Sequence, residues 1–314
     1  MTQPITIDCQ YIQPQLAAAY LLIHNGRAVF IENNTQYAVP IMMDVLREVG
    51  VSPENVDYAI VTHVHLDHAG GSSALMEACP NAQMLCHPRG HRHLVDPSRL
   101  IVGTEQVYGK ERFERLYGKI GGVAEDRVRS VTDGEEINWN GRMLRFLHTP
   151  GHASHHMSII DEESSSIFTG DSFGVCYPAL QRKGTVAFIS SPPTDFDVDL
   201  SRTSIEKTMA AGCEHVYPTH FGEIQDVKGA CDQLYEGLDF SAKVIDEVVQ
   251  ALRSGEDSAQ VEKMCTERVF QYAREQVKKV DMQLSDDDWQ LLDLDFELSA
   301  AGLFFSASRK AKKH

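Results

Sequence analysis

Residues 62–71 are the most informative part of this chain and read Thr62-His63-Val64-His65-Leu66-Asp67-His68-Ala69-Gly70-Gly71. Imidazole and carboxylate groups of the kind found here bind zinc, iron or manganese. In extended backbone His63 and His65 project to the same side. Asp67 and His68 follow where the chain turns toward a helix. Because this density of ligands follows the apolar segment 57–62, the stretch predicts a metal site at the end of a strand.

Three later segments place one more ligand each after a strand or a turn. They read Thr149-Pro150-Gly151-His152, Phe168-Thr169-Gly170-Asp171 and Tyr217-Pro218-Thr219-His220. Each is weak alone, because a single histidine or aspartate at a strand end is more often a cap or a surface residue. Together with the first stretch, and in this order, they complete the ligands of two metal sites.

The ordered set of seven ligands resembles that of the metallo-β-lactamase superfamily. The resemblance covers about residues 17–224 and implies an α/β fold, a four-layer αββα sandwich with the metal site at one edge, between the sheets. It implies that one metal is bound by His63, His65 and His152, and a second by Asp67, His68 and His220. It also implies that Asp171 bridges both metals, so Asp67 and Asp171 are the expected catalytic carboxylates.

Within the superfamily, several branches fit less well. True β-lactamases usually lack His68 and Asp171, the flavodiiron branch has Glu in place of His65, and the nuclease branch needs a large inserted domain. The layout is similar to glyoxalase II, the acyl-homoserine lactonases and the quinolone signal response protein. Arg182 and Lys183 lie near the position of the glutathione-binding Cys-Gly-Lys segment of glyoxalase II without matching it.

The resemblance implies a dinuclear hydrolase of a carbonyl ester, thioester or lactone. The expected cofactors are two divalent metal ions, with zinc as first candidate and iron or manganese as alternatives. Two such ions about 3.5–4 Å apart would share a hydroxide whose parent water has a pKa of about 7, and this hydroxide would attack the carbonyl carbon. One alternative is a regulatory or signal-response protein that retains the metal site but acts by binding. Another is an oxygen-reacting di-iron enzyme.

The sequence predicts two regions. Residues 1–225 alternate strand and helix patterns, with an Asn25-Gly26 hairpin turn and a long helical insert at about 89–122. Residues 226–314 carry three amphipathic helices, the third opening on a capping box at Ser285 and Asp288. We expect this helical region to pack on the first one and to help wall the entrance of the site.

Several other side chains are candidates for supporting roles. His156 lies four residues after His152, where a histidine behind the metal ligands is as plausible as simple packing. The aromatic residues Phe173, Tyr177 and Phe221 follow metal ligands closely and are expected either to line an apolar pocket or to pack in the core. His155 is expected to be structural or exposed, and the cluster of His87, His91 and His93 to be exposed or to start a helix.

The composition limits the partners. The net charge of −16 disfavours nucleic acid and anionic membranes. No apolar run is long enough to span a bilayer, and the seven cysteines form no CxxC pair, which favours a reduced, cytoplasmic protein. The expected partner is a small-molecule acyl substrate, and a homodimer is one option for the assembly.

Overall fold

The computed structural model describes residues 3–312 and divides into two units. Unit 1 consists of the chain up to His148, His155–Gly170 and Ala211–Glu223. Unit 2 consists of Thr149–Ser154, Asp171–Ala210 and the chain from Ile224 onward. The predicted boundary at residue 225, and the predicted packing of the C-terminal region on the rest, stay predictions.

Unit 1 contains two sheets. The first has six strands in the order β1 (Ile5–Asp8), β2 (Ala18–His24), β3 (Arg27–Ile31), β4 (Val56–Ile60), β5 (Gln83–Cys86) and β6 (Val128–Ser130). Strands β1 to β3 are antiparallel, and β3 to β6 are parallel. The turn between β2 and β3 consists of Asn25 and Gly26, both with positive φ, as the Asn-Gly pair predicts.

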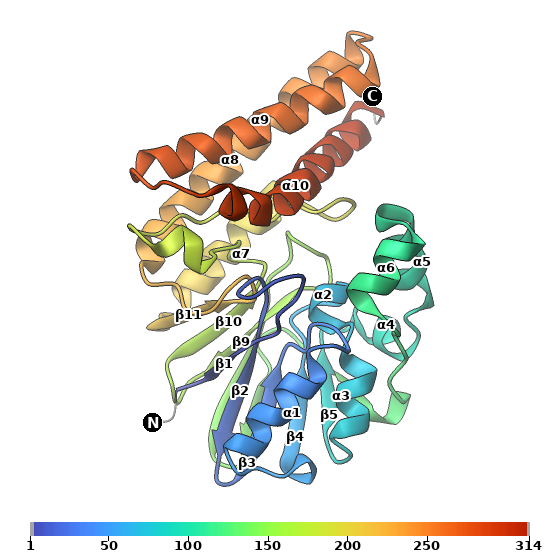
Figure 1. The fold of residues 1–314 in the computed structure, drawn as a ribbon, viewed down its shortest axis with the longest axis vertical. Helices are drawn as coiled ribbons and strands as arrows, with labels where there is room; N and C mark the ends of the chain where they lie inside the picture. Colours follow the sequence, from blue (N-terminus) through green and yellow to red (C-terminus); the bar gives the residue numbers. More distant parts are fainter. Residues whose placement is uncertain (1–2, 313–314) are drawn as a thin grey trace. The chain divides into compact units, whose positions relative to one another are not determined.

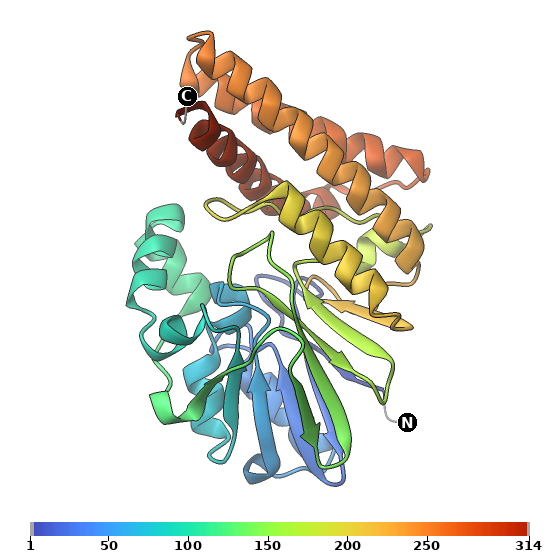
Figure 2. The ribbon, with the colours of Figure 1, turned by 180° about the vertical axis from the view of Figure 1, so that it is seen from behind.

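The second sheet has five strands in the order β11 (His215–Pro218), β10 (Ser166–Gly170), β9 (Met157–Asp161), β8 (Arg142–His148) and β7 (Glu136–Trp139). All neighbours are antiparallel except β10 and β11, which are parallel. Figure 2 shows unit 1 from behind, with the green strands of this second sheet toward the viewer. Because β10 and β11 run in the same direction, the residues that follow them leave the sheet at the same end, where both strands have their carboxyl termini.

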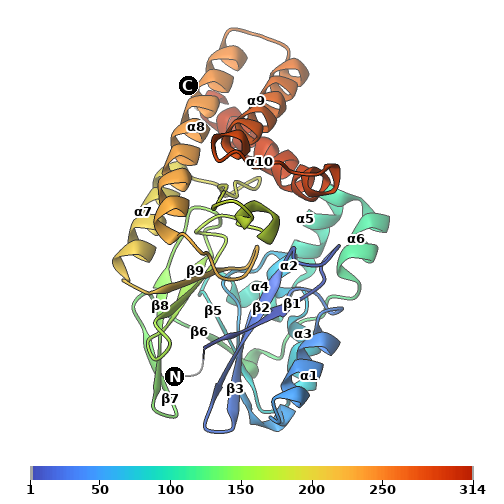
Figure 3. The same ribbon diagram turned by 60° about the vertical axis from the view of Figure 1, so that its left-hand side comes forward.

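Alternate residues of the first sheet enter two different cores. Ala19 and Leu21 of β2 pack with the helices α1 (Val39–Glu48) and α3 (Ser72–Ala78), whereas Tyr20 and Leu22 pack with the second sheet. Figure 1 shows α1 and α3 over one face of the first sheet, and Figure 3 shows the second sheet on its other face. This two-residue alternation is what places two cores on either side of one sheet. The predicted fold class, two sheets with helices plus C-terminal helices, is confirmed.

The segment 89–122 is not one long helix. It forms three short helices, α4 (His91–Val95), α5 (Ser98–Tyr108) and α6 (Lys110–Tyr117). Pro97 stands directly before α5, and Gly109 separates α5 from α6 with a φ of 76°. A helix interior tolerates neither proline nor left-handed backbone, so these two residues divide the predicted helix.

Unit 2 is mainly helical. It contains α7 (Val198–Ala210), α8 (Val227–Arg253), α9 (Ser258–Lys279) and α10 (Asp286–Lys312), preceded by the long loop of residues 171–197 with the short helix η3 (Pro178–Gln181). Helices α8, α9 and α10 contact one another, and they are the three amphipathic helices that the sequence predicts. The remaining short elements, in unit 1, are η1 (Pro53–Asn55), α2 (Leu66–Ala69) and η2 (Glu125–Arg127).

The predicted capping box of the third helix is present. The Asp288 backbone N–H donates to Ser285 Oγ at 3.2 Å, and the Ser285 backbone N–H donates to Asp288 Oδ2 at 2.9 Å. Among the described residues, none of the helices has both the length and the apolar character that a membrane crossing needs. All seven cysteines are free thiols.

Candidate metal centre

The histidine-rich loop starts where β4 ends at Ile60 and leads into the short helix α2. The loop after β3 holds it in place. The backbone N–H groups of Asn33 and Asn34 both donate to the His68 carbonyl at 3.0 Å. The Asn34 side-chain amide donates to the Asp67 carbonyl at 2.7 Å. Two loops that are far apart in the sequence therefore fix the backbone of both residues.

Gly70 and Gly71 allow this close approach. A Cβ atom on Gly70 would lie 2.3 Å from the Leu66 carbonyl oxygen, and one on Gly71 would lie 2.6 Å from the Asn33 carbonyl oxygen. Both glycines have negative φ values, −64° and −83°. A larger side chain would therefore collide with backbone atoms at both positions, although neither glycine adopts left-handed backbone.

Three predicted ligands of one metal converge in unit 1. The ligand atoms of Asp67, His68 and His220 all lie within 4.8 Å of one another. Asp67 Oδ2 is 3.7 Å from His68 Nε2 and 3.5 Å from His220 Nε2. Both imidazoles are buried, and Asp67 is partly exposed. One carboxylate and two imidazoles at this spacing match the ligand types of a divalent transition metal.

The other ring nitrogen of each histidine faces an oxygen atom behind the ring, by a hydrogen bond at His220 and by a close charged contact at His68. His220 Nδ1 donates to the Leu16 carbonyl at 2.7 Å, since a carbonyl can only accept. His68 Nδ1 lies 3.2 Å from Glu32 Oε2. These contacts leave Nε2 of both rings as the metal-binding atom, which is how carboxylates and carbonyls orient metal-binding histidines in proteins.

Glu32 is a residue of the centre that the sequence did not reveal. It follows β3, is 1% exposed, and accepts a hydrogen bond from the Thr62 backbone N–H at 2.9 Å through Oε1. Its backbone has a φ of 65°, which is uncommon outside glycine. The signal in the sequence was an acidic residue directly after an apolar strand, a position where a carboxylate is costly to bury without partners.

The other two histidines of the first stretch also approach each other. His63 Nε2 and His65 Nδ1 are 2.9 Å apart, and His63 Nδ1 lies 3.1 Å from Thr62 Oγ1. The rings of His155 and His156 lie 6.1 and 4.9 Å from the ring of His63, measured between centroids. His156 is therefore a close neighbour of a predicted ligand, and its supporting role stays a prediction. His155 is half-buried and also lies beside this loop.

The last two predicted ligands belong to unit 2. His152 lies in the segment between β8 and β9, and Asp171 follows β10 directly. Both side chains are buried, and His152 Nε2 lies 3.4 Å from Asp171 Oδ2. His152 Nδ1 lies 3.3 Å from the Ser190 carbonyl oxygen, so its outer nitrogen also faces a backbone acceptor. The seven predicted ligands are thus divided between the two units, five in unit 1 and two in unit 2.

A family model described as the metallo-beta-lactamase superfamily matches residues 16–220, which is more than half of the chain. This range includes all seven predicted ligands. The chain belongs to the metallo-beta-lactamase superfamily. The assignment agrees with the two sheets of unit 1 and with the histidine and aspartate cluster at their edge.

Named relatives of this superfamily are distant. The chain is 27% identical over 190 residues to the metallo-beta-lactamase fold-containing protein ST1585 of Sulfurisphaera tokodaii, covering 58% of this chain and 65% of that one. It is 25% identical over 183 residues to the atrochrysone carboxyl ACP thioesterase of Aspergillus fumigatus, covering 57% and 42%. The matches therefore span less than two thirds of the length of these relatives.

Solved structures show the same fold. The crystal structure of ST1585 superposes with a TM-score of 0.63 at 20% identity and covers 96% of this chain and 98% of that one. The metallo-beta-lactamase family protein TTHA1429 of Thermus thermophilus gives a TM-score of 0.63 at 19% identity and covers 98% and 93%. The subclass B3 metallo-beta-lactamase MEM-A1, from a soil metagenome library, gives 0.52 at 17% identity and covers 76% and 94%.

The predicted pocket aromatics are largely enclosed. Phe173 and Tyr177 are fully buried in unit 2, and the Tyr177 hydroxyl donates to Asp295 Oδ2 at 2.6 Å. Phe221 is partly buried and packs against the core between the sheets of unit 1. Their part in a substrate pocket stays a prediction. Arg182 forms a bidentate ion pair with Asp288 in unit 2, at 2.7 and 2.9 Å.

The second histidine cluster, of His87, His91 and His93, includes one ring that is buried and not exposed. His91 is the first residue of α4, as predicted for a helix start, and His87 is buried against the ring of His148 at 4.1 Å between centroids. His87 Nδ1 accepts the Arg89 backbone N–H at 3.0 Å. Burial of the ring lowers the pKa of His87 from 6.5 to about 4, and the neighbouring His148 makes a smaller contribution in the same direction. This ring is therefore neutral at physiological pH.

Proposed function

We propose that this protein is a metal-dependent hydrolase of a carbonyl ester, thioester or lactone. The observation that carries the proposal is the cluster of Asp67, His68 and His220. In it both imidazoles have Nε2 toward Asp67 and an oxygen atom behind Nδ1. A surface cluster of histidines would not need a buried carboxylate such as Glu32 behind it. Membership of the metallo-beta-lactamase superfamily, in which hydrolases are common, supports the same reading.

We further propose that the centre is dinuclear. In this proposal one metal is held by His63, His65 and His152, and the other by the Asp67, His68 and His220 cluster, with Asp171 between them. Supporting facts are the 2.9 Å approach of the nitrogens of His63 and His65 and the buried pair of His152 and Asp171. Asp171 directly follows β10 and His220 follows the parallel neighbour β11, so both come after strands that end at one edge.

The chain's own residues would supply orientation and charge. Divalent ions bound at such a site supply Lewis acidity and lower the pKa of bound water. Asp67 and Asp171 would balance part of the positive charge and set the positions of the ions. Glu32 and the Leu16 carbonyl would keep His68 and His220 in the tautomer that presents Nε2. Such preorganisation is the main contribution of a protein to metal-assisted hydrolysis.

A thioester is the bond that we favour among the three. The curated relative of Aspergillus fumigatus is named as a thioesterase, and its matched segment covers 57% of this chain. Thiolate is also a better leaving group than alkoxide and needs no proton donor positioned by the protein. The expected substrate is then a small-molecule acyl thioester.

The experiment is a turnover assay with matched thioesters, esters and lactones, before and after removal of metal by a chelator. Turnover that is lost with the chelator and restored by zinc, iron or manganese is the expected result. Metal-loaded protein that hydrolyses no member of the panel, but binds acyl compounds, would favour a regulatory protein that acts by binding and would overturn the hydrolase proposal.

A further inference from the structure

Unit 2 has a groove beside the last turns of α10, with a volume of about 660 Å³. The end of α8, the beginning of α9 and the carboxyl-terminal half of α10 form its walls. None of the seven predicted metal ligands lines it. The residues of this α10 groove that matter here are Leu252, Arg253, Glu262, Ala301, Phe305 and Lys312.

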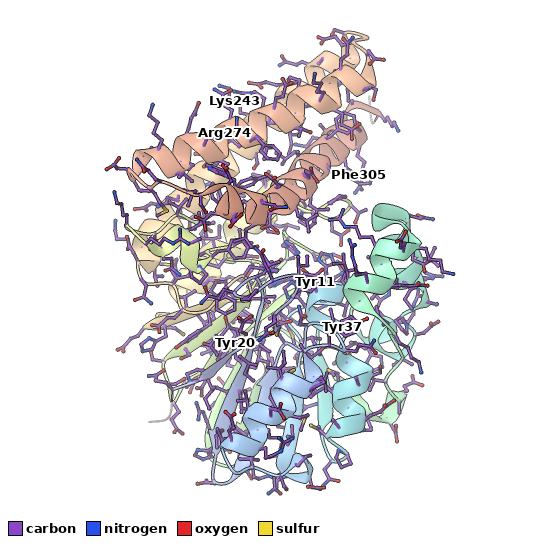
Figure 4. The ribbon with its side chains drawn as sticks, viewed as in Figure 1. Tyr11, Tyr20, Tyr37, Lys243, Arg274 and Phe305 are labelled. Atoms are coloured by element: carbon purple, nitrogen blue, oxygen red, sulfur yellow. The ribbon has the colours of Figure 1, made fainter. Side chains whose placement is uncertain are left out.

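The α10 groove offers an apolar surface that the packing of the chain does not use. Phe305 is 37% exposed, and Figure 4 labels it on α10. Leu252 and Ala301, which line the groove with it, are half-buried. The core side of α10, with Phe296 and Leu303, lies on the opposite side of the helix from Phe305. Phe305 therefore serves no core of unit 2 and is available to a partner.

The charges of the α10 groove favour an acidic partner. Arg253 and Lys312 are exposed and line the groove, together with one exposed acidic residue, Glu262. Arg253 Nη2 donates to the Lys310 carbonyl at 3.3 Å, so its contact is with backbone and not with a carboxylate. In a chain with a net charge of −16, this is a local excess of positive charge. A segment that combines acidic and apolar side chains would complement it.

The first half of α10 has this composition. Asp287, Asp293 and Glu297 are exposed, and Leu294 between them is half-buried. No basic residue occurs in α10 before Arg309. The helix dipole favours acidic residues in the first turn, but Asp293 and Glu297 lie beyond that turn. The chain thus carries both an acidic, apolar helix segment and a groove that such a segment fits.

The two halves of α10 are complementary along one side of the helix. At 3.6 residues per turn, Asp287, Leu294, Phe305 and Lys312 fall within about 20° of one another around the axis. When a second α10 lies antiparallel, the register that opposes Leu294 to Phe305 also opposes Asp287 to Lys312. Both pairs are centred on the same point of the helix, between residues 299 and 300. One register therefore satisfies the apolar pair and the charged pair, and a two-fold axis repeats each of them.

We propose that the α10 groove binds the first half of α10 of a second copy of this chain, in an antiparallel, two-fold symmetric dimer. The inference is independent of the hydrolase function. Helix α10 has 27 residues and is therefore about 40 Å long. A strip about 10 Å wide along it covers roughly 400 Å² per copy, which is small for a specific interface. The dimer should thus be reversible, with a dissociation constant of roughly 1–100 µM.

The first test is sedimentation equilibrium of the full chain from about 1 to 200 µM, the range in which a dimer of this size dissociates. The wild type should pass from monomer to dimer, and salt should weaken the dimer by screening its charges. Phe305→Ser should weaken it by about tenfold or more, because an apolar contact is lost on both sides. Met209→Ser, in α7, is the matched control, since Met209 is 38% exposed.

The second test reverses the charges of the proposed pair. Asp287→Lys alone and Lys312→Glu alone should each be monomeric where the wild type is a dimer, because either change places like charges together twice. An equimolar mixture of the two variants should dimerise again, within about threefold of the wild type, since opposite charges then meet at both contacts. Lys310→Glu, on the other side of the same helix end, should dimerise as the wild type does.

The mixture also shows that the single variants are folded, and their far-UV circular dichroism should match that of the wild type. A wild type that stays monomeric at every concentration would mean that a different acidic partner covers the α10 groove, and would overturn the inference. So would a dimer that Phe305→Ser and both charge reversals leave unchanged. Folded single variants whose mixture remains monomeric would contradict the proposed register and the antiparallel pairing with it.

Discussion

At the scale of single residues, the least expected feature is the buried carboxylate behind His68. Glu32 is 36 residues away in the sequence and reaches the ring only because β3 and β4 are parallel neighbours. The Leu16 carbonyl behind His220 is 204 residues away. The spacing of ligand-type residues could be read from the sequence, but these partners could not, because the fold alone brings them to the rings.

We predict that Glu32→Gln weakens metal binding by about 10–100-fold, because an amide holds the His68 ring less firmly than a carboxylate. The size of the side chain is kept, so the fold should be retained. Competition of the metal-loaded protein with a coloured chelator measures the change. Glu48→Gln, at an exposed position in α1, is the control. Equal metal affinity of both variants would show that Glu32 does not act through His68.

Asp171 is the residue on which the proposed pair of metals depends most. Asp171→Asn keeps the size but loses the charge, and an amide is a poor bridging ligand. Activity should fall by roughly a hundredfold or more, since a preorganised electrostatic element is lost. Metal content should fall as well.

The control for this variant is Asp199→Asn, at an exposed position in the first turn of α7. His155→Ala is unsuitable as a control because the His155 ring lies beside those of His63 and His65. Near-normal turnover of Asp171→Asn with full metal loading would remove the bridging role.

At the scale of elements, the sequence predicted turns and helices correctly where a short local pattern determines the backbone. Asn25-Gly26 predicted the hairpin, and the spacing of apolar residues predicted α8, α9 and α10. The strands β1 and β7 were not predicted. Both are four residues long and lie at sheet edges, where pairing with one neighbour decides their conformation more than their own sequence does.

The capping box of α10 gives a prediction at this scale. Ser285→Ala removes the oxygen that accepts the Asp288 backbone N–H, so unit 2 should lose about 1 kcal/mol of stability. The chain has two tryptophans, and Trp289 lies in the first turns of this helix. Urea unfolding followed by tryptophan fluorescence measures the loss. Ser308→Ala, near the other end of α10, should leave the midpoint unchanged, and equal midpoints for the two variants would contradict the capping role.

At the scale of the whole molecule, acid sensitivity follows from burial. The pKa of His87 is about 4 in the folded protein against 6.5 as its ordinary value. Between these values the unfolded chain binds a proton that the folded chain does not. Stability is therefore complete above pH 6.5 and is lost as the pH falls toward 4.

His87→Asn should remove this dependence, because asparagine does not titrate and its side-chain oxygen can still accept the Arg89 N–H. The free energy of unfolding of the metal-free protein, measured at several pH values, gives this dependence. Between pH 6.5 and 4 the wild type should lose about 1–2 kcal/mol more than the variant. Parallel pH profiles for the two proteins would show that His87 is not responsible.

The family and the fold class could be predicted from the sequence, because seven ligand-type residues in a fixed order follow strand and turn patterns. The surroundings of the expected pocket aromatics could not. Phe173 and Tyr177 follow Asp171 closely in the sequence, and both are enclosed in unit 2. Proximity to a ligand along the chain does not decide whether a side chain is exposed or buried, because the packing of distant segments decides it.

The most direct test of the whole account is the metal content of the purified protein. Elemental analysis after growth with adequate zinc, iron and manganese should give about two ions per chain, as the two sets of ligands require. The identity of the metal would follow from the same measurement. Protein that is folded, yet carries no metal and takes up none on titration, would contradict the dinuclear centre and the hydrolytic function together.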